Sequence, residues 1–134
     1  MKVYAFGEEN APVILLLPGT CCHWKGNFGH VIPLLSDEYR VLCVSYDGFD
    51  ETERTEFPTM LEETAKIEDY LKANCVGHIR AAYGCSLGGA CLTRLLAEGR
   101  LPVGRAVIDA GITPYQLPLL LRRLACLRDT LAVR

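Results

Sequence analysis

Continuous apolar runs alternate along the chain with segments in which apolar residues recur every three or four positions. The runs are typical of strands buried on both faces, and the recurring positions are typical of amphipathic helices. The predicted strands cover residues 2–6, 13–19, 40–48, 78–84 and 105–111. The predicted helices cover residues 25–35, 59–74 and 87–98, and a helical tail follows from about residue 115.

The helix over residues 59–74 carries the clearest local signals. Thr59 and Glu62 form a capping box, in which each side chain can bond a free backbone amide of the first turn. Met60, Thr64, Ile67 and Leu71 lie along one stripe of this helix. The helix that starts at residue 87 is expected to end at Gly99, because glycine readily adopts the left-handed C-cap conformation.

This alternation predicts the α/β class, with a mostly parallel sheet and helices on both faces. We expect a single α/β domain over residues 1–134, with core strands and helices in 1–111 and a helical tail in 112–134. In such sheets, functional sites lie at the carboxyl ends of the strands. The loops 19–25, 47–53, 84–88 and 109–114 are therefore the places to search.

Composition narrows the class of protein further. Half of the 134 residues are hydrophobic and 22% are charged, which is typical of a globular domain. A net charge of −2 without a dense basic run argues against nucleic-acid binding. The apolar run at 13–18 is too short to cross a membrane, and the N-terminus does not resemble a signal peptide.

The cysteines indicate a reducing compartment. There are seven, an odd number, and no C-x-x-C pair occurs. We interpret them as reduced, small hydrophobic residues of a cytoplasmic protein. The cysteines also lack the ligand spacing typical of zinc sites, which argues against a zinc or other metal site.

The segment Gly84-Cys85-Ser86-Leu87-Gly88 matches the pattern G-x-S-x-G and lies between a predicted strand and a predicted helix. That context favours a nucleophile elbow, in which a strained turn holds the serine hydroxyl above the sheet. Gly84 and Gly88 avoid a collision between strand and helix. The helix from Leu87 directs its amides and its positive dipole end at the reacting centre. The alternative is a glycine-rich turn with an incidental serine.

Two further loops lie at the same end of the predicted sheet as Ser86. Pro18-Gly19-Thr20 ends a buried strand, and this loop can supply a backbone amide to an oxyanion together with that of Leu87. Thr20 is the first candidate donor and Cys21 the second. The segment "SYDGFDET" is a turn after the next strand, and we interpret its Asp50, Glu51 and Glu53 as a solvated acidic loop.

Together, the strand ending in Pro-Gly, the D-G-F turn, the G-x-S-x-G-G elbow and "VIDAG" resemble the N-terminal part of an α/β-hydrolase. The resemblance runs from residue 13 to about residue 111. It implies a Ser–His–acid triad and hydrolysis of an ester, thioester, amide or related bond of a small acyl substrate. It also implies that no cofactor is needed.

The chain departs from the family pattern in its triad, because no histidine follows Ser86. His78 opens the elbow strand, so at about 3.3 Å per residue it lies at the opposite edge of the sheet. His23 follows the carboxyl end of a predicted strand, at the same end of the sheet as Ser86, and is a candidate base. A polar loop residue without a catalytic role is the simpler interpretation. Asp109 ends the neighbouring strand and is a candidate acid, or it caps the next turn. We therefore expect a hydrolase fold that is cut short and inactive or weakly active alone.

The tail repeats leucines at intervals of three and four, with arginines largely outside the stripe. It resembles the start of a helical cap over the site, and the alternative is a helix packed on its own sheet. Exposed apolar surface of this kind drives association. We therefore expect a homo-oligomer that forms through the tail helix or the open sheet edge.

Two other classes of protein compete with a serine hydrolase. A non-catalytic α/β-hydrolase-like module for binding or association is favoured by the missing base. A nucleotide-binding domain would need a G-x-G-x-x-G or Walker A loop after a strand, and the chain has neither.

Overall fold

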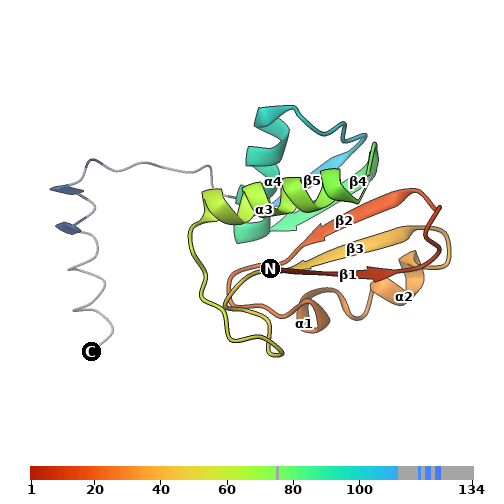
Figure 1. The fold of residues 1–134 in the computed structure, drawn as a ribbon, viewed down its shortest axis with the longest axis horizontal. Helices are drawn as coiled ribbons and strands as arrows, with labels where there is room; N and C mark the ends of the chain where they lie inside the picture. The colour runs from red at the N-terminus through yellow and green to blue at the C-terminus, as the bar shows by residue number, and fades with distance from the viewer. Residues whose placement is uncertain (75, 112–117, 119, 122, 125–134) are drawn as a thin grey trace.

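In the computed structural model, five strands form one twisted sheet with helices on both faces (Figure 1). The structure describes residues 1–74, 76–111, 118, 120–121 and 123–124. The elements in chain order are β1 (Lys2–Phe6), β2 (Val13–Leu17), α1 (Trp24–Phe28), α2 (Ile32–Leu35), β3 (Arg40–Ser45), α3 (Met60–Ala73), β4 (Ile79–Cys85), α4 (Leu87–Glu98) and β5 (Ala106–Asp109).

The strand order is β1-β3-β2-β4-β5. β2, β3, β4 and β5 run parallel to their neighbours, and β1 pairs antiparallel with β3. The prediction of a mostly parallel sheet covered on both faces is confirmed. The prediction of one helix over residues 25–35 is wrong in detail, because two short helices, α1 and α2, occupy this segment.

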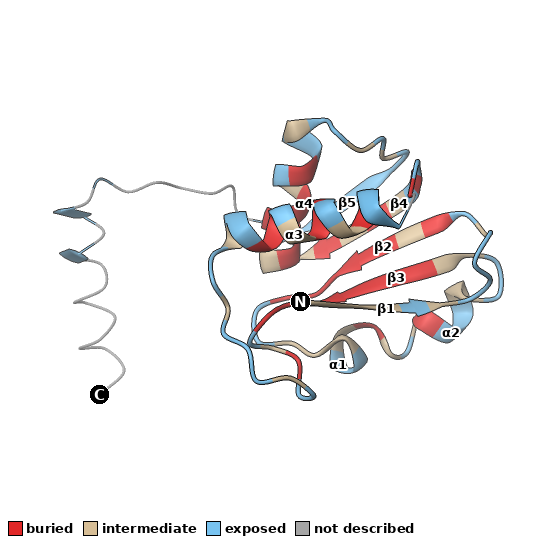
Figure 2. Cartoon of the chain, viewed as in Figure 1, coloured by how far each residue is buried: buried red, intermediate tan, exposed pale blue. Residues whose placement is uncertain are grey.

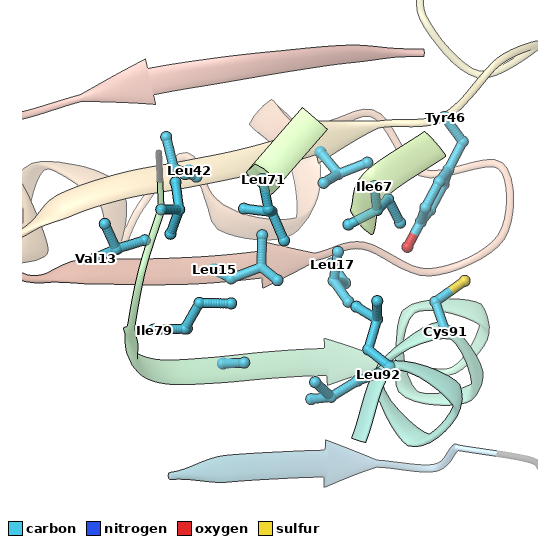
Figure 3. Packing of buried hydrophobic residues seen from close by; sticks show 14 residues of the cluster. Val13, Leu15, Leu17, Leu42, Tyr46, Ile67, Leu71, Ile79, Cys91 and Leu92 are labelled. Carbon is cyan, nitrogen blue, oxygen red and sulfur yellow. The ribbon is translucent and has the colours of Figure 1, made fainter. Parts of the chain in front are cut away.

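The core is divided by the sheet into two layers. On one face, α3 and α4 pack on β2, β3 and β4 around Leu15, Leu17 and Leu42, and Figure 3 shows these side chains between the ribbons. On the other face, α1 and α2 cover Leu16, Val41 and Cys43. Buried segments therefore concentrate in the central strands, as Figure 2 shows, while β5 is exposed throughout.

The local signals of α3 and α4 are confirmed in part, because the described hydrogen bonds include the Thr59 half of the capping box and not the reciprocal bond to the Glu62 side chain. The Thr59 side chain accepts a hydrogen bond from the Glu62 amide at 3.2 Å, and Thr64, Ile67 and Leu71 are buried. α4 ends at Gly99, whose φ of 62° is left-handed. The predicted tail over residues 112–134 lies outside the described residues except at positions 118, 120–121 and 123–124.

Candidate active site

Ser86 occupies the turn between β4 and α4. Its φ of 50° and ψ of −110° are unfavourable for a residue with a side chain, and Ser86 is exposed. The strain is held in place because the Ser86 amide donates to the Asp109 carbonyl at 2.8 Å and the Ser86 carbonyl accepts from the Ala90 amide. A strained conformation with an exposed side chain is typical of a functional serine.

Close packing around the turn leaves no room for larger residues at Gly84 and Gly88. A Cβ at Gly84 would lie 2.6 Å from the Gly88 carbonyl carbon. A Cβ at Gly88 would lie 2.5 Å from the Leu17 carbonyl carbon. Real Cβ atoms do not approach other atoms so closely, so both positions need glycine if α4 is to start directly above β2 and β4.

The loop after β2 reaches the elbow. A Cβ built at Gly19 would lie 3.8 Å from the Cβ of Ser86, so Gly19 leaves room for about one methyl group beside the serine. Thr20 and Cys21 form the exposed tip of the turn that follows, and Cys21 has a φ of 56°. This turn and the elbow lie at the switch point of the sheet, where β2 leads to α1 and β4 leads to α4 on opposite faces.

Backbone amides are available at this point. Leu87 is the first residue of α4, and first-turn amides have no acceptor within their own helix. The positive end of the α4 dipole adds to their attraction for an anion. The structure therefore places Ser86, Leu87 and the Thr20-Cys21 turn at the carboxyl ends of the neighbouring strands β2 and β4.

Two residues that sequence reasoning missed hold the loop after β2. The Asn27 side chain, from α1, accepts a hydrogen bond from the Gly19 amide at 3.0 Å. The Tyr46 hydroxyl, from the end of β3, donates to the Pro18 carbonyl at 3.1 Å. Burial raises the pKa of Tyr46, so this donor stays protonated at neutral pH. No local sequence signal reveals either contact, because each joins the loop after β2 to another element, α1 for Asn27 and the end of β3 for Tyr46.

Cys22 was also missed. A Cβ built at Gly19 would lie 3.8 Å from Cys22 Sγ as well as from the Ser86 Cβ, so both side chains border the space beside Gly19. Cys22 is half-buried. Its amide donates to the Gly19 carbonyl and closes the turn.

Asp109 lies at the end of β5, beside the elbow strand. Its Oδ2 accepts a hydrogen bond from the Tyr83 hydroxyl at 2.7 Å. This bond, with burial, raises the pKa of Tyr83 to about 12. The candidate acid thus has a tyrosine as its described partner, and no described hydrogen bond or ion pair connects it with a histidine.

The candidate base His23 caps α1. Its Nδ1 accepts from the Lys25 amide at 3.3 Å, and its ring lies 6.3 Å from that of Tyr4, in β1. β1 is separated from β4 by two strands. No described hydrogen bond joins His23 to Ser86 or to Asp109. The structure therefore does not bring the three candidate triad residues into a hydrogen-bonded chain.

The other two histidines lie away from Ser86. His30 lines an apolar groove of about 450 Å³ between α1, α2 and the sheet. His78 lies at the amino-terminal edge of β4 in a separate depression with Arg80 and Glu38, as its place in the sequence predicted.

The interpretation of Asp50 as part of a solvated loop is wrong. Asp50 is buried and accepts hydrogen bonds from the Tyr4 hydroxyl at 2.8 Å and from the Thr52 amide at 2.9 Å. These bonds outweigh the effect of burial and lower its pKa. Asp50 therefore ties the loop after β3 to the edge strand β1. Glu51 remains exposed, as expected.

Among the described residues, no three histidine, cysteine or acidic side chains gather as a metal site would require. In the same part of the chain, none of the helices has the length and apolar character needed to span a bilayer.

Comparison with known proteins identifies the family to which the chain belongs. The alpha/beta hydrolase family model matches residues 14–134, and the chain belongs to this family. No curated protein matches the chain.

Solved structures with the same fold include three that show its range. A protein from Desulfitobacterium hafniense, assigned to the α/β-hydrolase family, is 27% identical with a TM-score of 0.78, over 83% of this chain and 44% of that one. The 2-hydroxy-6-oxo-6-phenylhexa-2,4-dienoate hydrolase from Rhodococcus sp. strain RHA1 is 20% identical with a TM-score of 0.69, over 95% and 48%. An epoxide hydrolase from hot-environment metagenomes is 24% identical with a TM-score of 0.70, over 84% and 38%. The chain thus spans less than half the length of each of these structures.

Proposed function

We propose that Ser86 is the nucleophile of a serine hydrolase that acts on an ester, thioester or related acyl bond of a small molecule. The observation that carries the proposal is the left-handed backbone of Ser86 between β4 and α4. A hydrolase family membership and an exposed serine at the switch point support the same role.

In this reaction the Ser86 Oγ attacks the acyl carbonyl carbon, and the carbonyl oxygen becomes an oxyanion. The amides of Leu87 and of Thr20 or Cys21 are the donors we assign to that oxygen. Preorganised amides of this kind contribute about 10²–10³ in rate per donor. Gly19 keeps the approach to Ser86 open, because it carries no side chain beside the serine.

The proton of Ser86 needs an acceptor, since a serine hydroxyl is a weak nucleophile at neutral pH. None of the chain's histidines has a described hydrogen bond to Ser86. We therefore propose that these 134 residues alone are inactive or weakly active, and that an imidazole from another source completes the reaction. The free cysteines among the described residues support a reducing, cytoplasmic location.

A second candidate is a binding or association module that keeps the hydrolase fold without catalysis. The absence of a described histidine contact at Ser86 favours it. The two candidates differ in the reactivity of Ser86, whereas the fold is common to both.

The test is covalent labelling with a fluorophosphonate probe, followed by intact-mass measurement. We expect slow formation of a single adduct, and a rate that rises with added imidazole, because a free base replaces the missing one. Ser86→Ala should abolish the adduct. Ser36→Ala is the matched control, since Ser36 follows α2 away from the elbow, and it should label like the wild type.

Absence of an adduct at every imidazole concentration would reject the nucleophile and leave the binding module. An adduct that persists in Ser86→Ala would assign the reaction to another residue and would also reject it.

A further inference from the structure

A single peptide group at the end of β2, the one that joins Pro18 to Gly19, is held from both sides. The Pro18 carbonyl accepts a hydrogen bond from the Tyr46 hydroxyl at 3.1 Å, and the Gly19 amide donates to Asn27 Oδ1 at 3.0 Å. The peptide is trans, so its carbonyl and its amide point in opposite directions. Because a peptide group is planar, two hydrogen bonds at its opposite ends fix its rotation about the chain.

The two side chains that hold this peptide come from opposite faces of the sheet. Tyr46 follows β3 and is fully buried in the core beneath α3 and α4. Its ring packs edge-to-face against Phe49 and Phe57, with ring centroids 6.1 and 6.3 Å away, and this packing restricts the position of the hydroxyl. Asn27 belongs to α1, which covers the other face. The peptide therefore takes its position from both layers of the core.

The Tyr46 hydroxyl also adjoins α4, the helix that begins at the elbow. Burial first, and the Cys91 thiol second, raise the pKa of Tyr46, so the hydroxyl stays protonated beside this thiol at neutral pH. Figure 3 shows the Tyr46 ring reaching from the end of β3 toward Cys91. Cys91 lies about one turn after Leu87, on the same side of α4. One buried side chain thus lies next to both segments that carry the oxyanion donors assigned above.

The clamped peptide precedes the turn that supplies one of those donors. Gly19 lacks a side chain, so its backbone has wide rotational freedom unless it is restrained. Its carbonyl accepts from the Cys22 amide at 3.3 Å, which closes the turn around the left-handed Cys21. The Cys22 amide is therefore occupied, and within the part of the chain that the structure describes the amides of Thr20 and Cys21 donate no hydrogen bond. The direction of these two amides follows from the orientation of Gly19.

We propose that Tyr46 and Asn27 are positioning residues for the loop after β2. They lock its first peptide group in one orientation, so that the amides of the Thr20-Cys21 turn are directed at the oxyanion formed when Ser86 attacks. Both residues act through the backbone rather than by contact with the substrate. The inference rests on the proposed function, because the charge to be stabilised is the one that Ser86 generates.

The test measures the rate of fluorophosphonate labelling at several probe concentrations, with imidazole held constant. In this reaction Ser86 Oγ bonds phosphorus, fluoride leaves and imidazole takes the serine proton, while negative charge grows on the phosphonyl oxygen. Oxyanion donors act on that charge in the transition state. They therefore raise the maximal labelling rate and leave the half-saturating probe concentration unchanged.

Tyr46→Phe removes one oxygen from the clamp and keeps the ring in the core. Asn27→Ala removes the acceptor of the Gly19 amide. A displacement of about 1 Å at a catalytic group costs about 10²-fold in rate, so we expect each variant to lower the maximal labelling rate about 10- to 100-fold. The half-saturating probe concentration should stay within about twofold of the wild type.

Tyr4→Phe and Asn74→Ala are the matched controls. The Tyr4 hydroxyl donates to Asp50 at 2.8 Å, and Asn74 Nδ2 donates to the Tyr70 carbonyl at 2.8 Å. Each control removes the same kind of hydrogen bond, at β1 or at the end of α3, away from the elbow. Both should label like the wild type.

Amide hydrogen exchange followed by NMR tests the clamp without any reaction at Ser86. The Gly19 amide should exchange at least about tenfold faster in Asn27→Ala than in the wild type, because its acceptor is lost. In Asn27→Asp, which keeps an acceptor oxygen at this position, exchange should stay slow. Equal exchange in all three proteins would reject the clamp.

The labelling outcomes separate this role from the reactivity of Ser86. A wild type that forms no adduct at any imidazole concentration would reject the proposed function, and the positioning role with it. If the wild type labels at Ser86 and both Tyr46→Phe and Asn27→Ala label at the same rate, the nucleophile stands and the positioning role is overturned. A change confined to the half-saturating probe concentration, or an equal loss in the matched controls, would also overturn it.

Discussion

Gly88→Ala tests the close approach of α4 to the sheet on which the elbow depends. The added Cβ would lie 2.5 Å from the carbonyl carbon and 2.8 Å from the Cβ of Leu17, and closer still to the carbonyl oxygen. Ordinary contacts of a Cβ begin at 3.4 Å. The obstacle is largely backbone, which no side-chain rotation removes, so α4 has to move away from β2 by roughly 1 Å.

The cost follows from what α4 buries. Cys91, Leu92 and Leu95 pack in the core beneath it, and their exposed fractions are 0%, 0% and 5%. A gap of 0.5–1 Å loses about a quarter to a half of each dispersion contact, and each buried leucine contributes about 1.5–3 kcal/mol. With the strain of overpacking added, we expect the free energy of unfolding to fall by about 3 kcal/mol or more.

The assay is equilibrium unfolding in urea, followed by circular dichroism. Gly77→Ala is the matched control, because a Cβ added at Gly77 would meet no described atom within 4 Å beyond its chain neighbours, and Gly77 has no left-handed φ. It should stay within about 0.5 kcal/mol of the wild type or be slightly stabilised. If Gly88→Ala unfolds at the same urea concentration as Gly77→Ala, the close packing of the elbow is refuted.

Two further predictions concern stability outside the elbow. Burial alone would raise the pKa of Asp47, but hydrogen bonds from Lys66 and the Met1 amine outweigh it and lower the pKa from 3.8 to about 2. A lowered carboxyl pKa stabilises the fold above the unfolded value, so this contribution, on the order of 1 kcal/mol after solvent screening, is lost as the pH falls from about 4 to about 2. Urea unfolding of Asp47→Asn should show a flatter pH dependence in that interval, and an unchanged slope would contradict the assignment. Thr59→Ala removes the N-cap of α3 and should cost about 1 kcal/mol by the same assay. A cost near zero would mean that the Thr59 cap does not stabilise α3.

Local patterns predicted the helices and strands well because their causes are local. The N-cap at Thr59 and the C-cap at Gly99 depend on backbone groups within one turn. The boundaries of the strands differ from the predicted ones by a few residues at most, mainly because the predicted ranges include the turn residues that follow, such as Pro18-Gly19 and Asp47-Gly48. The break between α1 and α2 was missed because the apolar pattern continues through it.

The elbow could be anticipated because it is also nearly local. A glycine on each side of Ser86, after an apolar strand and before a helix, has few physical explanations. The pattern could not predict which strands are neighbours in the sheet, or which side chains meet as a result. The contacts of Asn27 with Gly19, of Tyr46 with Pro18 and of Tyr83 with Asp109 each cross between elements.

The sequence by itself thus determined the α/β class, most of the elements and the strained serine, because these follow from periodicity, turn chemistry and steric limits within a few residues. Only the tertiary structure decided that β1 joins β3 antiparallel, that Asp50 is buried, that the ring of His23 lies against Tyr4 and that β5 pairs parallel with β4. The order β1-β3-β2-β4-β5 is the reason. It sets which side chains meet across the sheet, and strand order is a property of the whole fold rather than of any segment.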